Sequence, residues 1–280
     1  ETVSTEEQEE EDEDLEFDFG PYEEGLELDP DAVDYDVVET EEELRAFADR
    51  LQEQDRYAFD AEATSKEPVY ADLVGLSFSW EAETATYVPT PLPDETPTDA
   101  VLSVLAPMLE EETEKVGHNR ACHVSLLMLN ELDAADHLFD TMVAHYLVAP
   151  EQNHNLGDVS RAVLNYKMVP ISELIGDDAD HDTMREVDVQ EAAPYACEDA
   201  DIALRLADEL EGQLEEGNVL DIARDIEFPL IHVLAAMEHT GIRLDTDVLD
   251  EISEGLEDRL ETIETEIFDL AGEEFNINSP

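Results

Sequence analysis

Two acidic residues, Asp60 and Glu62, stand two positions apart at the end of the apolar run Tyr57-Ala58-Phe59. In an extended chain, residues i and i+2 point to the same face, so both carboxylates aim at one spot. Carboxylate oxygens are the ligands that hard divalent ions prefer, so the pair predicts a divalent-metal site. The alternative is a solvated strand edge, because Asp and Glu make up 77 of the 280 residues and such pairs arise often by chance.

The composition fits a large folded domain in an unusual solvent. An apolar content of 42% over 280 residues is enough for a core, so disorder of the whole chain is excluded. The net charge of -64 comes with ten Arg but only three Lys. An acidic surface nearly free of lysine indicates a halophile, because the Debye length falls to about 3 Å in molar salt and self-repulsion is then screened.

Residues 1–34 form an acidic segment with seventeen Asp or Glu and neither Lys nor Arg. A block of this kind buries too little apolar surface to fold, so residues 1–34 are predicted to be an acidic disordered linker.

The two cysteines, Cys122 and Cys197, are far apart and show no metal-ligand spacing. This pattern favours a reduced, cytoplasmic protein. No apolar run is long enough to span a membrane, so no membrane partner is expected.

The elements that must position the carboxylate pair begin with a strand at 35–38 and a helix after a capping box of Thr40 and Glu43. The strand that bears the pair follows. Alternation of apolar and small residues then predicts strands at 74–80 and 84–90, and these three strands are expected in meander order.

From residue 99 onward, the apolar spacing changes to that of helices, apart from a short buried strand at 115–117. The predicted helices lie at 101–109, 124–132, 141–148, 156–166 and 187–215. Strands followed by helices, with strand-helix-strand crossings, predict an α/β fold in which helices flank a mixed β-sheet.

The last 60 residues differ in character. A helix is predicted over 219–239 with an interruption at Pro229, followed by a short extended stretch at 242–244 and a long helix with a narrow apolar seam. We expect a C-terminal helical hairpin that packs on something outside this sequence, and we expect the chain to be part of a longer protein.

Six segments resemble one known family in their order and spacing: FDAEATS, LVGLSFSW, KVGHN, FDTM, YACEDAD and AGEEFNINSP. They resemble the 3′-to-5′ exonuclease domain of bacterial DNA polymerase I, family A, from about residue 35 to residue 280. The resemblance implies an RNase H-like mixed sheet flanked by helices. It also implies a linker at 1–34, an exonuclease-like domain at 35–216 and the start of the polymerase domain, with thumb helices, at 217–280.

The same resemblance assigns roles to residues at the matching positions. Asp60 would bridge two divalent metals, Mg2+ or Mn2+, and Glu62 and Asp199 would hold the first of them. Tyr195 would orient the attacking water, and it shares a helix face with Asp199 because the two are four residues apart. Asn119 would contact DNA. This chemistry would remove a nucleotide from a DNA 3′ end.

One motif departs from the family. The pattern Asn-x-x-x-Asp becomes Asn119-Arg120-Ala121-Cys122-His123, so the fourth carboxylate, a ligand of the second metal, is replaced by His123. Imidazole is a poor ligand for magnesium, although manganese or zinc would accept it. We favour a vestigial or structural role for His123 over metal ligation. Other family residues are replaced by Ala61, Ala63, Lys66 and Cys122.

Several further polar residues are expected to lack catalytic roles. Asp140 is predicted to cap the helix that begins at Thr141. Arg120 and Arg161 are expected to pair with neighbouring carboxylates. Four histidines share no common spacing and are expected to be surface or satisfied core residues: His118, His137, His145 and His154.

Two functions of different classes fit these features. The first is the proofreading 3′-5′ exonuclease region of a DNA polymerase I, attenuated by His123. The second is a catalytically silent domain that acts as a scaffold for the polymerase. An RNA-trimming exonuclease of the same superfold ranks third, because the ending EEFNINSP resembles the entry to a polymerase. The expected partners are a single-stranded DNA 3′ end or primer-template DNA and the remainder of the polymerase chain, with the chain as a monomer.

Overall fold

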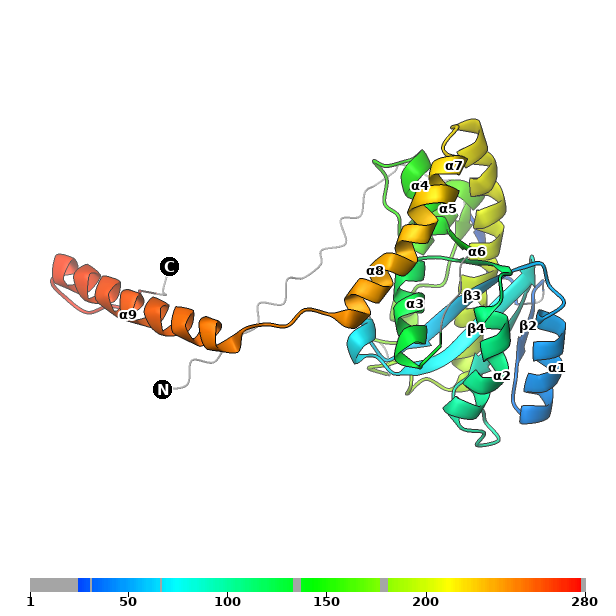
Figure 1. Cartoon of the computed structure of the whole chain (residues 1–280), viewed down its shortest axis with the longest axis horizontal. Coiled ribbons are helices and arrows are strands. Elements are labelled where there is room, and N and C mark those ends of the chain that lie inside the picture. The colour runs from blue at the N-terminus through cyan, green and yellow to red at the C-terminus, as the bar shows by residue number, and fades with distance from the viewer. Residues whose placement is uncertain (1–24, 31, 66, 133–136, 177–180, 278–280) are drawn as a thin grey trace. The chain divides into compact units, whose positions relative to one another are not determined.

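A computed structural model describes residues 25–30, 32–65, 67–132, 137–176 and 181–277 (Figure 1). Most of the predicted acidic linker, Lys66 and the final Asn278-Ser279-Pro280 lie outside the described residues. The described chain divides into two compact units, one that ends at His239 and one that starts at Thr240. None of the described helices is long and apolar enough to cross a membrane.

The centre of the first unit is a six-stranded sheet with the order β2-β5-β4-β3-β6-β7. Neighbours β3, β4 and β5 pair antiparallel, as the predicted meander requires, and the remaining pairs are parallel. The mixed α/β sheet is therefore confirmed. The strands are β2 (Asp34–Val37), β3 (Arg56–Ala63), β4 (Leu73–Glu81), β5 (Thr84–Pro89), β6 (Glu114–Gly117) and β7 (Leu138–Asp140).

One face of the sheet is aromatic and is covered by α1 (Glu41–Leu51) and α2 (Thr98–Glu110), which Figure 1 shows side by side. The ring of Phe78 lies 6.0 Å from that of Phe59 and 5.4 Å from that of Phe47. The Tyr57 hydroxyl donates to the Met108 carbonyl at 2.8 Å. Because side chains alternate along β3, these contacts turn its carboxylates to the opposite face. The predicted capping box at the start of α1 is confirmed.

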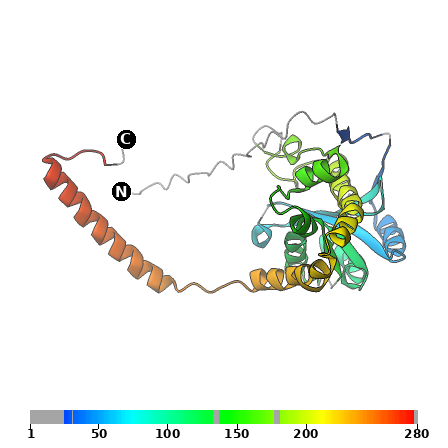
Figure 2. The ribbon, with the colours of Figure 1, turned by 90° about the horizontal axis from the view of Figure 1, so that it is seen from above.

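The opposite face is covered by α6 (Val189–Glu216), drawn in yellow-green to yellow in Figure 2, which lies across the sheet and contacts β2, β3, β4, β5 and β6. Its small residues Ala193, Ala196 and Cys197 pack against Ala85 and Tyr87 of β5. Small side chains let the helix lie close to the strands. Helices α4 (Thr141–Val148) and α5 (Leu156–Leu164) in turn contact α6.

Helix α3 (Arg120–Leu129) begins four residues before the predicted start at 124. Asp140, at the end of β7, explains this difference. Its carboxylate accepts the backbone N–H of Arg120 at 2.7 Å, and it also caps α4 through the N–H groups of Met142 at 2.8 Å and Val143 at 3.1 Å. The predicted cap on α4 is confirmed. The bond to α3 comes from a residue twenty positions away, so local patterning could not reveal it.

A two-stranded sheet pairs β1 (Leu26–Glu27) with β8 (Tyr166–Lys167). The described end of the predicted disordered linker is thus partly structured, and Asp34 already belongs to β2. The helix predicted over 156–166 ends at Leu164 because Asn165 adopts the left-handed conformation and turns the chain into β8. The Lys167 ammonium also lies 2.8 Å from a Glu27 carboxylate oxygen.

After α6 the chain continues as α7 (Leu220–Ile222), the π-helical segment η3 (Ala223–Glu227) and α8 (Phe228–Thr240). The predicted interruption near Pro229 takes the form of this π-helical segment, and Pro229 itself is the second residue of α8. Proline lacks an N–H and clashes with the preceding turn, and the wider π turn before it takes up that irregularity. The Phe228 ring lies 5.0 Å from that of Phe139, so the start of α8 packs against β7 within the first unit. The predicted division at residue 216 stays a prediction.

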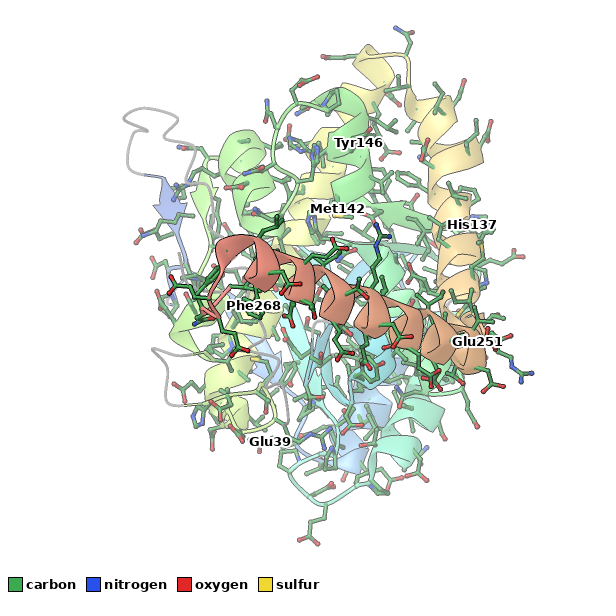
Figure 3. The ribbon with its side chains drawn as sticks, turned by 90° about the vertical axis from the view of Figure 1, so that its left-hand side faces the viewer. Glu39, His137, Met142, Tyr146, Glu251 and Phe268 are labelled. Carbon is green, nitrogen blue, oxygen red and sulfur yellow. The ribbon has the colours of Figure 1, made fainter. Side chains whose placement is uncertain are left out.

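In the second unit, α9 (Thr246–Ala271) is one uninterrupted helix. The predicted apolar seam is exposed, as Val248, Ile252 and Leu256 are each about half accessible. Near the end of the helix, the ring of Phe268, which is labelled in Figure 3, lies 5.6 Å from the ring of Phe275. The pairing of α8 and α9 as a hairpin stays a prediction. Two short 3-10 helices, η1 (Pro68–Tyr70) and η2 (Ile171–Glu173), lie in the first unit.

The double role of Asp140 gives a stability prediction. Asp140→Ala removes three hydrogen bonds from a buried carboxylate and should lower the unfolding free energy by about 2–3 kcal/mol. Asp188→Ala is the matched control, since Asp188 caps α6 from an exposed position with one N–H, and it should cost about 1 kcal/mol. Denaturant unfolding of both variants measures the difference. Equal losses would show that the bond to α3 contributes nothing.

Candidate active site

Three carboxylates meet on the α6 face of the sheet. Asp60 and Glu62 come from β3, and Asp199 comes from α6. One ligand oxygen from each lies within 4.8 Å of the other two. No other group of three or more His, Cys, Asp or Glu in the described chain meets this criterion. The structure therefore brings together the three carboxylates that the sequence selected.

Burial makes these carboxylates poor anions in the absence of a cation. Loss of water raises the pKa of Asp60, of Glu62 and, most strongly, of Asp199. The charge of Asp60 raises the pKa values of Glu62 and Asp199 further. Glu62 Oε1 is buried without a hydrogen-bond partner. A divalent cation would satisfy this oxygen and balance the repulsion, so the donor set fits a metal ion.

Gly75 and Tyr87 shape the wall beside Glu62. Gly75 lies opposite Glu62 in the β3–β4 register. A Cβ at Gly75 would approach the Tyr87 hydroxyl oxygen to 2.3 Å, so only glycine lets that ring reach the site. Burial, followed by the charge of Glu62, raises the pKa of Tyr87. Sequence reasoning missed both residues, although a glycine inside an apolar strand is a signal of close approach.

Tyr195 and Asp199 share one face of α6, as predicted from their spacing. The Tyr195 hydroxyl donates a hydrogen bond to the Asp199 carboxylate. Burial and then the charge of Asp199 raise the pKa of Tyr195 well above its ordinary value, so this phenol keeps its proton. The tyrosine is thereby a fixed donor at the edge of the carboxylate cluster.

The neighbouring acidic residues of α6 face other partners. Glu198 accepts the Tyr166 hydroxyl and the Val169 N–H, each at 2.8 Å. Asp201 accepts the Tyr35 hydroxyl at 3.0 Å and the Glu83 N–H at 2.8 Å. These two buried carboxylates hold the helix against the sheet and the following loop, so Asp199 is the one of the three that enters the site.

His123 lies beside the cluster but is not a member of it. Its Nε2 is 3.2 Å from Asp60 Oδ1, and its ring stands 6.2 Å from that of Phe59. Burial and then the nearby charge of Arg120 hold the pKa of His123 well below its ordinary value. Both causes disfavour the positively charged form of the imidazole at this position.

Asn119 opens α3 with a left-handed backbone, at φ 53°. Its side chain is exposed and forms no capping hydrogen bond to the helix. An amide in this position is free to meet an external ligand, as its predicted DNA contact requires.

Other expectations for polar residues are partly corrected. Arg120 does not form an ion pair within the described chain but is fully buried, with its guanidinium over the Phe59 ring. His118 and His145 are buried and hydrogen-bonded, through His118 Nδ1 to Thr141 Oγ1 at 2.9 Å and His145 Nδ1 to His154 Nδ1 at 2.8 Å. Three of the four histidines therefore form one local group, which their irregular spacing hid. His137 and Arg161 are exposed, and Cys122 is half-buried with a free thiol.

Sequence comparisons agree with this geometry. The model of the 3′-5′ exonuclease family found in family A DNA polymerases matches residues 35–215. DNA polymerase I of Pseudomonas aeruginosa is 33% identical over 258 residues, which cover 89% of this chain and 28% of that protein. DNA polymerase I of Chloroflexus aurantiacus is 36% identical over 249 residues, which cover 87% of this chain and 26% of that protein. The chain thus spans about a quarter of the length of these relatives.

Solved structures share the fold. A polymerase domain of Pol1 from M. smegmatis, in complex with DNA primer-template and dNTP, matches with a TM-score of 0.68 and 21% identity over 88% of this chain and 39% of that one. Brucella melitensis NrnC with bound Mg2+ matches with a TM-score of 0.56 and 18% identity over 75% of this chain and 94% of that one. The RNase H-like fold is thereby confirmed. The family model covers nearly the whole exonuclease-like region, and the alignments with the DNA polymerase I relatives continue into the helices that follow it. The chain therefore belongs to the 3′-5′ exonuclease domains of DNA polymerase I, family A.

Proposed function

We propose that this chain hydrolyses DNA from the 3′ end with the help of a divalent metal ion, Mg2+ or Mn2+. The observation that carries the proposal is the convergence of Asp60, Glu62 and Asp199, with a buried Glu62 oxygen that lacks a partner. An ion bound there supplies Lewis acidity, which activates water and stabilises the charge that develops on the phosphate. NrnC, one of the structural neighbours, was solved with bound Mg2+.

The side chains of the site divide the remaining work. Asp60, Glu62 and Asp199 hold the ion and fix the place of the scissile phosphate. Tyr195 keeps its proton and donates to Asp199, so its oxygen is left to accept a hydrogen bond from the attacking water and orient it. Asn119 contacts the DNA from the start of α3.

The replacement of the fourth carboxylate by His123 attenuates this activity. A neutral imidazole against Asp60 cannot supply the charge or the hard oxygen that a second Mg2+ requires. The alternative, a silent scaffold for the polymerase, has less support, because three carboxylates and Tyr195 remain assembled at high local cost.

The partners follow from the family. The M. smegmatis neighbour is complexed with DNA primer-template, and the curated relatives are DNA polymerases I. We propose a single-stranded DNA 3′ end or a primer-template as the ligand and the remainder of a polymerase chain as the covalent partner. Proofreading, a monomeric state and a cytoplasmic location belong to the same proposal.

A nuclease assay tests the assignment. On single-stranded DNA with a labelled 3′ end, Asp60→Ala should slow degradation at least about 100-fold in Mn2+, because a ligand of the ion is lost. Glu209→Gln, which removes an exposed carboxylate from the same helix as Asp199, should leave the rate unchanged. His123→Asp should raise the rate in Mg2+ about tenfold or more by restoring an oxygen ligand. Absence of degradation in both metals, even after His123→Asp, would favour the scaffold.

The pH dependence of stability tests the buried charge. Burial raises the pKa of Glu62 from 4.5 to about 8. The folded state therefore holds a proton that the unfolded state loses, and the unfolding free energy falls as pH rises between these values. Without metal, Glu62→Gln should gain in Tm relative to the unaltered chain between about pH 5 and about pH 8.5, since glutamine does not titrate.

Saturating Mg2+ should cancel that gain in Tm. The ion stabilises the ionised site of the unaltered chain by mass action, and it binds more weakly to the variant, which lacks one carboxylate ligand. Thermal unfolding at each pH, with and without Mg2+, provides the measurement. A Tm difference that does not change with pH would contradict the buried-acid assignment.

The acidic composition supports a halophilic source. With a net charge of -64, screening of surface repulsion should stabilise the fold as KCl rises from about 0.1 M to about 2 M. We expect Tm to increase by at least about 4 °C, which corresponds to about 1 kcal/mol or more for a domain of this size. Sucrose at the same osmolality is the control for general solute exclusion. A rise of equal size in sucrose would show that charge screening is not the cause.

A further inference from the structure

Arg120 is a fully buried cation next to the carboxylate cluster. Its Nη1 donates to the carbonyl oxygen of Phe59 at 3.1 Å, and that carbonyl belongs to the peptide bond that leads into Asp60. The guanidinium carbon lies 3.5 Å from the centre of the Phe59 ring. The charge is thus fixed against the backbone of the strand that carries two of the three carboxylates.

The backbone leaves a specific space for this side chain. A Cβ at Gly117 would approach Arg120 Cδ to 2.4 Å and Nη1 to 2.8 Å. Gly117 ends β6, the parallel neighbour of β3, so the glycine lets the guanidinium pass between the two strands and α3. The fit indicates a built position for the charge.

The buried charge has no direct counter-ion. Within the described chain, no carboxylate oxygen lies within 4.0 Å of the guanidinium, and Arg120 Nε and Nη2 have no hydrogen-bond partner. The carboxylates that act on it electrostatically are Asp140 and Asp60. Of these two, Asp140 is held in place by three backbone N–H donors, and Asp60 belongs to the metal-binding cluster.

We propose that Arg120, with His123, takes the place of a second divalent ion, so that the site holds one ion per chain. The inference rests on the proposed function. A second divalent ion at Asp60 would have to bind near the guanidinium of Arg120, which is fully buried and cannot move away. Repulsion between like charges is strong where little water screens it, so the fixed guanidinium disfavours the second ion.

His123 completes the substitution from the ligand side. Its Nε2 lies against Asp60 Oδ1, the carboxylate that would otherwise be shared between two ions. The guanidinium is permanently charged, so a positive charge stays near Asp60, and the imidazole of His123 covers an oxygen that a second ion would need. The histidine at position 123 and the buried cation at position 120 therefore act in the same direction.

Counting bound Mn2+ by titration calorimetry and by the EPR signal of free Mn2+ tests the proposal on the full chain. The number of specifically bound ions is the number bound by a variant minus the number bound by Asp60→Ala, because exposed carboxylates also bind ions weakly. We expect one ion in the unaltered chain and one in Arg120→Leu. The double variant Arg120→Leu with His123→Asp should bind two.

The charge-retaining double variant Arg120→Lys with His123→Asp is the matched control. It and His123→Asp alone should bind the second ion at least tenfold more weakly than the leucine double variant. Leucine is suited to the position, because apolar replacements of buried charges are often tolerated, and near-UV circular dichroism verifies that each variant is folded.

The outcomes separate the two proposals. Two specific ions in the unaltered chain, or equal second-ion affinity in His123→Asp and in the leucine double variant, would overturn the role of Arg120 and leave the nuclease assignment intact. No specific ion in any variant would overturn the proposed function and this inference together.

Discussion

Burial of three like charges at one point is the constraint on which the site and much of the fold depend. Asp60 and Glu62 meet Asp199 on the covered face of the sheet, where loss of water raises the pKa of each. The protein can hold such a cluster only if the surrounding packing is secured elsewhere. The aromatic contacts on the opposite face of β3 do this. Because side chains alternate along a strand, β3 buries its aromatic rings on one side and directs its carboxylates to the other.

The surrounding polar groups follow from the same constraint. Glu198 and Asp201 flank Asp199 in the sequence, yet each is saturated by hydrogen bonds to other elements. These bonds hold both carboxylates outside the cluster, and the charge of Glu198 adds only after those of Asp60 and Glu62 to the raised pKa of Asp199. Tyr195 binds Asp199 as a neutral donor, and Gly75 lets the neutral Tyr87 stand beside Glu62. The surroundings of the site are thus neutral hydroxyl groups and one buried cation, Arg120, which leaves negative charge available to a metal ion.

Whether the sequence predicted a feature depends on how far apart in the chain the interacting residues lie. The carboxylate pair, the capping box of α1, the cap on α4 and the shared face of Tyr195 and Asp199 depend on spacings of two to four residues, and the structure has all of them. The early start of α3, the burial of Arg120 and the grouping of the histidines depend on partners 9 to 61 residues away. Local patterns contain no record of such partners. Gly75, a glycine inside a strand, was the one local sign that a side chain distant in the sequence, Tyr87, lies close to the backbone.

Because Lys and Arg are scarce in this chain, the few that are buried are informative about where positive charge is needed. Of the twelve Lys and Arg that the structure describes, two are fully buried, Lys115 on backbone carbonyls and Arg120 on the Phe59 carbonyl and ring. Dissolved salt screens the acidic surface, because ions of the solvent reach it. The same ions do not reach a buried cluster, where charge must be balanced by fixed groups or by a bound metal. A chain with an acidic surface therefore still needs specific cations inside, and Arg120 occupies the position where one such charge acts on Asp60.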